Sequence, residues 1–84
     1  MELTDLRITA VGSEAVLARV VVLLTARGAR IRELQCRTVP TGTTRISCTV
    51  ETANGRGGRV AAAVARMVDV TDVEVESARL VARA

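Results

Sequence analysis

The sequence predicts an α+β fold in which a four-stranded antiparallel sheet carries two helices on one face. Apolar and polar residues alternate near both ends of the chain, as in half-buried strands, and two segments between them have helical spacing. A turn signal divides the middle of the chain. The resulting order, strand–helix–strand–strand–helix–strand with short connections, is the ferredoxin-like βαββαβ arrangement, for which we expect the sheet order 4-1-3-2. We expect residues 1–84 to form this single domain.

The first strand and the first helix precede Gly28. Leu6 and Ile8 alternate with polar residues in the strand. Ser13 is suited to cap the helix, and Gly28 to end it in the left-handed conformation. The helical stripe consists of Leu17, Val20, Val21 and Leu24.

A hairpin is predicted next. The second strand runs from about residue 31 to 39, and in "VPTGT" Pro40 and Gly42 favour a reversal. The third strand returns over residues 44–51. Cys36 and Cys48 then become cross-strand or diagonal neighbours in one apolar layer, and we expect both to be reduced and to serve packing.

The second helix is predicted from Arg59, and the last strand follows it. The apolar side of this helix is formed by Val60, Val64, Met67 and Val68. Val73 and Val75 begin the strand, which can continue through Leu80 and Val81. The preceding loop is "TANGRGG". It matches neither G-x-x-x-x-G-K-[ST] nor G-x-G-x-x-G, the glycine spacings typical of phosphate-binding loops, and is interpreted as a surface turn.

The sheet face away from the helices is predicted to be polar. It would carry Asp5, Arg7, Thr9, Glu33, Gln35, Arg37, Arg45, Ser47, Thr49, Asp72, Glu74 and Glu76.

Composition argues against several functions of this fold. The chain has no His to act as a base, so we expect no catalytic residue, no metal site and no cofactor. RNA-binding modules of this fold stack bases on sheet aromatics, and there is no Phe, Tyr or Trp here. The net charge is +3 and no apolar run could span a membrane, so we expect a cytoplasmic protein that binds neither nucleic acid nor membrane.

Two sequence blocks resemble one family. "LARVVVLLTARGARIRELQCRTV" resembles the L-S-R-V … F-x-x-R-G-x-N-I-x-x-L stretch of ACT domains in the regulatory (small) subunit of acetolactate synthase. The matching residues are Leu17, Arg19, Val20, Arg27, Gly28, Ile31 and Leu34. "VARMVDVTDVEV" is similar to that family's L-x-K-L-V-D-V-x-x-V block, at Met67, Val68, Asp69, Val70 and Val73.

The resemblance implies a non-catalytic regulatory subunit of the short, single-domain form. Its partner would be the thiamine-diphosphate-dependent acetolactate synthase catalytic subunit of branched-chain amino-acid biosynthesis, which it would activate or stabilise. Two alternatives stay open. One is a stand-alone ACT module that senses an amino acid for another enzyme, and the other is a ligand-free dimerisation domain.

The resemblance also places an amino-acid effector site at the loop before the first helix. Its residues would be Gly12, Ser13, Glu14, Ala15, Val16, Leu17 and Ile31. In the dimer this loop would lie near the second strand of the other subunit, so the site would be a cleft between two copies of the chain. Where family members have N-x-P-G, this chain has Glu14 and Ala15 in place of Pro and Gly. A carboxylate and an added Cβ at that point disfavour an amino-acid ligand, so we expect weak or absent binding of a branched-chain amino acid.

A side-by-side homodimer is expected, because the second strand lies at a sheet edge and open edges tend to pair with another chain. The first helix also has apolar residues beyond the predicted stripe. The expected interface residues are Val16, Val22, Leu23, Ile31 and Leu34.

Overall fold

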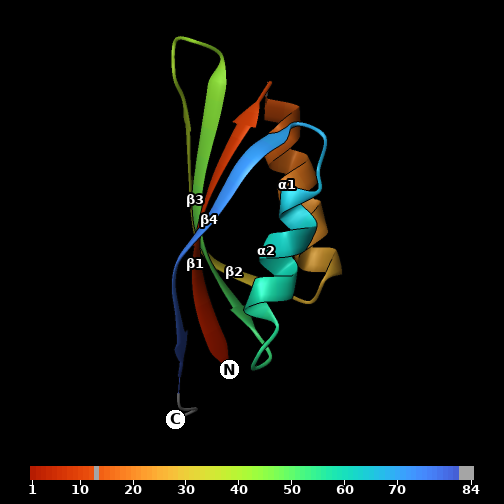
Figure 1. Cartoon of the computed structure of the whole chain (residues 1–84), viewed down its shortest axis with the longest axis vertical. Coiled ribbons are helices and arrows are strands. Elements are labelled where there is room, and N and C mark those ends of the chain that lie inside the picture. The colour runs from red at the N-terminus through yellow and green to blue at the C-terminus, as the bar shows by residue number, and fades with distance from the viewer. Residues whose placement is uncertain (13, 82–84) are drawn as a thin grey trace.

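The computed structural model describes residues 1–12 and 14–81 and contains the six predicted elements in the predicted order. They are β1 (Glu2–Val11), α1 (Glu14–Ala26), β2 (Arg30–Thr38), β3 (Thr43–Thr52), α2 (Gly57–Ala65) and β4 (Val70–Leu80). The strands form one antiparallel sheet in the order β2-β3-β1-β4, which is the predicted order read from the other edge. Both helices lie on the same face of this twisted sheet (Figure 1). The ferredoxin-like fold class is confirmed.

The first strand is the centre of the sheet. Leu6 of β1 lies opposite Cys48 of β3 on one side and Val75 of β4 on the other. The pairing with β4 runs from Ala10 to Glu2, and beyond it the Val81 N–H donates to the Met1 carbonyl at 2.9 Å. Segments from opposite ends of the sequence therefore lie side by side.

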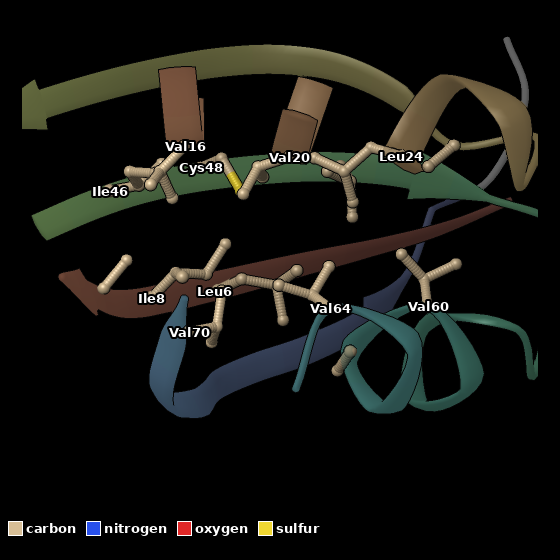
Figure 2. Packing of buried hydrophobic residues seen from close by; sticks show 14 residues of the cluster. Leu6, Ile8, Val16, Val20, Leu24, Ile46, Cys48, Val60, Val64 and Val70 are labelled. Atoms are coloured by element: carbon tan, nitrogen blue, oxygen red, sulfur yellow. The ribbon is translucent and has the colours of Figure 1, made fainter. Parts of the chain in front are cut away.

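The core fills the space between the sheet and the helices, and its apolar side chains are small or medium-sized. Figure 2 shows Val16, Val20 and Leu24 of α1 packed toward β3, and Val60 and Val64 of α2 packed toward β1. The buried apolar residues are Leu6, Ile8, Ala10, Val16, Val20, Leu24, Ala29, Ile46, Cys48, Val50, Val60, Ala61, Val64 and Val70.

The buried stripe of α1 differs from the predicted one. Val16 is 1% exposed and belongs to the core, so its assignment to the dimer surface was wrong. Val16, Val20 and Leu24 are four residues apart and form the buried line, whereas Leu17 and Leu23 flank it and are partly buried. Val22 is 67% exposed, as expected of a surface residue. None of the helices within the described ranges is long and apolar enough to cross a membrane.

The end of α1 follows the prediction for Gly28. Gly28 has φ +79° and its N–H donates to the Thr25 carbonyl at 3.0 Å, while the Ala29 N–H donates to the Leu24 carbonyl at 2.9 Å. These two bonds form a Schellman motif, and the buried Ala29 packs beside Leu24 in the core. The helix thus ends just before Arg27 and Gly28, and β2 begins two residues after Gly28, at Arg30.

The predicted hairpin is also present. The Gly42 N–H donates to the Val39 carbonyl at 3.0 Å, which places Pro40 at the second position of the turn. Gly42 has φ +87°, and the Val39 N–H donates to the Thr43 carbonyl at 2.9 Å. This three-residue connection fixes the register of β2 on β3, with Thr38 opposite Thr44.

The second helix starts and ends earlier than predicted. It begins at Gly57, where the backbone N–H donates to the Glu2 carboxylate at 2.9 Å. A carboxylate at this position satisfies a free N–H and the positive end of the helix dipole, so the chain itself fills the place where a phosphate could bind. Val68 lies after the helix and is 97% exposed, so its assignment to the apolar side was wrong.

The second strand is an edge strand that the helices do not cover. Leu34 and Cys36 face the helix side of the sheet, opposite Cys48 and Ile46 of β3. Cys36 is nevertheless exposed and Leu34 is 37% exposed, because neither helix covers this part of β2. The two cysteines are diagonal neighbours on one face, as expected, but only Cys48 is a core residue.

Candidate functional site

The loop before α1 is anchored to the sheet through its backbone. Gly12 has φ +116°, a conformation that favours glycine, and its carbonyl accepts a hydrogen bond from Thr44 Oγ1 at 3.1 Å. A Cβ on Gly12 would lie 3.3 Å from Val16 Cγ2. The geometry of this loop therefore depends on Gly12, which lies three residues before Ala15, the position where the family has Gly.

The residues of the expected effector site do not all come together within one chain. Ala15 is exposed and Leu17 is partly buried, but the Val16 side chain points into the core and cannot contact a ligand on the surface. Predictions that concern Ser13 and the side chain of Glu14 lie outside what the structure describes. Ile31 begins β2 at the opposite end of α1, roughly 20 Å from the loop for a helix of this length.

An apolar groove of about 430 Å³ lies on the outer side of α1. It is lined by Ala18, Arg19, Val22, Leu23, Ala26 and Met67. Arg19 Nη2 donates to the Asp69 carboxylate, and this ion pair links α1 to the segment that follows α2. Sequence analysis identified Val22 and Leu23 as surface apolar residues but did not reveal that Met67 completes the groove.

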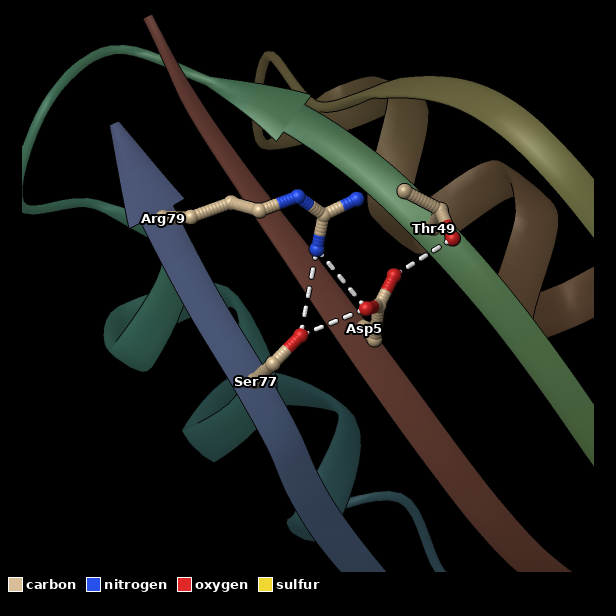
Figure 3. Close-up of polar contacts among 4 residues, drawn as sticks. All are labelled: Asp5, Thr49, Ser77 and Arg79. Atoms are coloured by element: carbon tan, nitrogen blue, oxygen red, sulfur yellow. Dashed lines mark hydrogen bonds and ion pairs between the residues drawn. The ribbon is translucent and has the colours of Figure 1, made fainter. Parts of the chain in front are cut away.

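The sheet face away from the helices, called the open face below, carries a hydrogen-bonded cluster centred on Asp5. Its carboxylate accepts hydrogen bonds from Thr49 Oγ1 at 2.6 Å, Ser77 Oγ at 2.5 Å and Arg79 Nη1 at 2.8 Å (Figure 3). These donors come from β3 and β4, on both sides of β1. The cluster therefore ties three strands together, and the donors Ser77 and Arg79 were not among the residues that the sequence singled out.

The Asp5 cluster predicts an acid-sensitive contribution to stability. The hydrogen bond from Ser77, with those from Thr49 and Arg79, lowers the pKa of Asp5 from 3.8 to about 2. Since the folded pKa lies below the unfolded one, the stabilisation is complete above pH 4 and is lost as the pH falls toward 2. The Asp5 side chain is one-third exposed, so we expect about 1 kcal/mol after solvent screening.

Urea unfolding of wild type and Asp5→Asn at several pH values measures this contribution. The variant should be less stable by about 1 kcal/mol at pH 7, and the difference should vanish near pH 2. A difference that stays constant with pH would contradict a role for the charge.

Three arginines lie around a second depression on the open face. It has a volume of about 550 Å³ and is lined by Arg7, Gln35, Cys36, Arg37, Arg45 and Ser47. Arg7 forms an ion pair with Glu76 at 2.9 Å. Arg37 lies directly opposite Arg45, and among the described residues neither has an ion-pair partner. The hairpin turn sets this pairing, so the register of the predicted hairpin could have revealed it.

The two groups whose pKa values are shifted, Asp5 and Cys48, are unsuited to proton transfer or nucleophilic attack. Burial, with a smaller effect of the Asp5 charge, raises the pKa of the Cys48 thiol to about 11, so the thiol is neutral and unreactive at pH 7. Asp5 titrates near 2 and is fully ionised at pH 7. The described surfaces comprise an apolar groove, an open strand edge and a charged sheet face.

Comparison with solved structures identifies the fold. The ACT domain from GTP pyrophosphokinase of Chlorobium tepidum superimposes with a TM-score of 0.73 at 14% identity, over 86% of this chain and 94% of that chain. The C-terminal domain of the MgtC protein from Mycobacterium tuberculosis gives 0.68 at 13% identity, over 88% and 84% of the two chains. A homoserine dehydrogenase from Thiobacillus denitrificans gives 0.70 at 17% identity, over 88% of this chain but 17% of that one.

No family model and no curated protein sequence matches the chain. The structural likeness nevertheless assigns it the fold of an ACT domain.

Proposed function

We propose that this chain is a non-catalytic regulatory subunit that binds an acetolactate synthase catalytic subunit and activates or stabilises it. The observation that carries the proposal is that the two sequence blocks resembling the small subunit meet in space. Arg19, in the first block, donates to the carboxylate of Asp69, in the second. Both matched blocks therefore contribute to one surface next to the α1 groove, on an ACT fold.

Gly28 and Ile31 of the first block have roles that fit the same proposal. Gly28 adopts the left-handed conformation that ends α1, and Ile31 places its side chain against the core at the start of β2. The sheet order leaves the outer edge of β2 without a strand partner among the described residues. An open edge and an apolar groove on α1 support assembly through a homodimer.

The effector site is proposed to be weak or absent. Ala15 is exposed at the first turn of α1, so its methyl group occupies the surface where an effector would approach the backbone. Val16, in the core, offers no side-chain contact. Activation of the catalytic partner would then not require a branched-chain amino acid.

Reconstitution tests the proposal. The purified chain is added to the catalytic subunit of acetolactate synthase from the same organism, and acetolactate formation and co-elution on gel filtration are measured. We expect a stable complex with higher activity, or a longer half-life of activity, than the catalytic subunit alone. No complex at micromolar concentrations of both proteins would contradict the proposal.

Calorimetry with valine, leucine and isoleucine separates the remaining possibilities. We expect no binding heat, together with activation. Binding of an amino acid without activation would favour a stand-alone ACT sensor of another enzyme. If neither amino-acid binding nor activation is observed, the remaining interpretation is a ligand-free dimerisation domain.

A further inference from the structure

The outer edge of β2 carries a regular pattern of charges. Glu33, Gln35 and Arg37 lie on the open face of the sheet, opposite Thr49, Ser47 and Arg45 of β3. Leu34 and Cys36 lie between them on the helix side. β2 pairs with β3 only, so within the described chain its other edge is free of strand partners.

Among the residues that the structure describes, nothing neutralises the two charged residues of this pattern, Glu33 and Arg37. Arg37 faces the like charge of Arg45, an arrangement that destabilises a strand pair. Among the described residues, Glu33 and Arg37 form no ion pair, whereas Asp5, Arg7 and Glu51 each have an arginine or carboxylate partner. A carboxylate and a guanidinium four residues apart on a free edge are thus available to another chain.

We propose that two copies pair through β2 in the antiparallel register that places Gln35 opposite Gln35 of the partner subunit. The inference rests on the homodimer of the proposed function and specifies its interface. In this register Glu33 faces Arg37 of the partner subunit, and Arg37 faces Glu33 of the partner subunit. On the helix side, Leu34 packs against Cys36 of the partner subunit, which covers two exposed residues.

Competing registers lack these ion pairs. A two-fold axis perpendicular to the sheet keeps both open faces on one side, so only residues of the same face can oppose each other. Centring the pair on Leu34 places Glu33 opposite Gln35, and centring it on Cys36 places Gln35 opposite Arg37. Centring it on Glu33 or Arg37 opposes like charges. The register centred on Gln35 alone matches opposite charges.

The local geometry of β2 also favours this register. A bulge lies between Ile31 and Glu33, so the regular part of the strand begins at Glu33 and ends at Thr38. The pairs from Glu33 to Arg37 fall within this regular part.

The other edge strand is less suited to pairing with itself. β4 has irregularities in its pairing with β1 at two places, next to Leu6 and next to Ala10. Bulges of this kind interrupt an edge. The open face of β4 carries Asp72, Glu74 and Glu76, and self-pairing would bring carboxylates together. The two edges therefore differ, and β2 is the one we assign to the dimer.

Charge reversal tests the register. Glu33→Arg and Arg37→Glu should each weaken the wild-type dimer about tenfold in sedimentation, because each replaces two attractive pairs with two repulsive ones. An equimolar mixture of the two variants should form a heterodimer as tight as wild type, since both cross-strand pairs are then attractive. Glu74→Arg, the same charge change on the same face of β4, is the matched control and should leave dimerisation unchanged.

A disulfide test reads the register directly. Gln35→Cys in a Cys36→Ala background should form a covalent dimer when diamide oxidises the two thiols, because directly opposite residues have Cβ atoms about 5 Å apart. Wild-type Cys36 should not cross-link, since in this register the two Cys36 residues are diagonal, roughly 7 to 8 Å apart.

The outcomes separate the register from the dimer itself. A dimer that is insensitive to both reversals, or that cross-links through Cys36 and not through position 35, overturns the register and leaves the homodimer intact. A wild-type monomer at micromolar concentration overturns both. Activation of acetolactate synthase is measured independently of either result.

Discussion

Leu24→Ala is expected to lower the free energy of unfolding by about 2 to 5 kcal/mol, the usual range for a fully buried leucine that leaves a cavity. Leu24 has no exposed surface and packs with Ala29 at the point where α1 ends. A chain of 84 residues has a total stability of roughly 4 to 13 kcal/mol, so this loss is a substantial fraction of the total.

Urea denaturation followed by circular dichroism checks this, with protein concentration held constant because association adds to apparent stability. Leu23→Ala is the neighbouring control. Leu23 is only partly buried and lines the groove on α1, so its truncation should cost less than half as much. Equal losses for the two variants would contradict the observed orientation of α1.

Gly57→Ala should destabilise the fold by about 1 to 3 kcal/mol, the range typical of overpacking. A Cβ at Gly57 would lie 2.2 Å from Thr4 Oγ1 and 2.5 Å from Glu2 Oε1, so α2 would have to move away from β1 or both side chains would have to rotate. The same shift would break the hydrogen bond from the Gly57 N–H to Glu2.

The next residue is a matched control for the same substitution. A Cβ at Gly58 would meet no atom within 4 Å, so Gly58→Ala should raise stability by about 0.5 to 1 kcal/mol through helix propensity alone. Thr4→Ala, added to Gly57→Ala, should recover part of the loss, because it removes the closest clash and a buried hydroxyl with no hydrogen-bond partner. Similar effects at both glycines would show that α2 packs less closely on β1 than described.

Local signals in the sequence were sufficient for the order of the elements and for their turns. Gly28 and Gly42 both adopt positive φ, at the places where a helix end and a hairpin require it. Alternation in β1 and β3 assigned each side chain to the correct face, because the period of two leaves little freedom. These features depend on neighbours a few residues away.

The errors concern packing between elements. Apolar residues occupy nearly every position of α1 from Val20 to Leu24, so periodicity could not determine which side faces the sheet, and Val16 was placed on the surface. The exposure of Cys36 depends on how far the helices reach across the sheet, which no local pattern encodes. Of the expected effector site, the sequence located the loop, but it could not show that Val16 points inward.

The central place of β1 has a consequence for how the chain folds. This strand precedes its partners β3 and β4 in the sequence, and its pairing with β4 joins Glu2 to Leu80. Sheets built from such distant segments close slowly, in milliseconds to seconds, because the entropy of long loops is lost before the contacts form. Until β4 emerges, the apolar face of β1 has an unpaired edge that can associate with other chains. The emergence of β4 from the ribosome therefore controls how long the nascent chain is prone to aggregate.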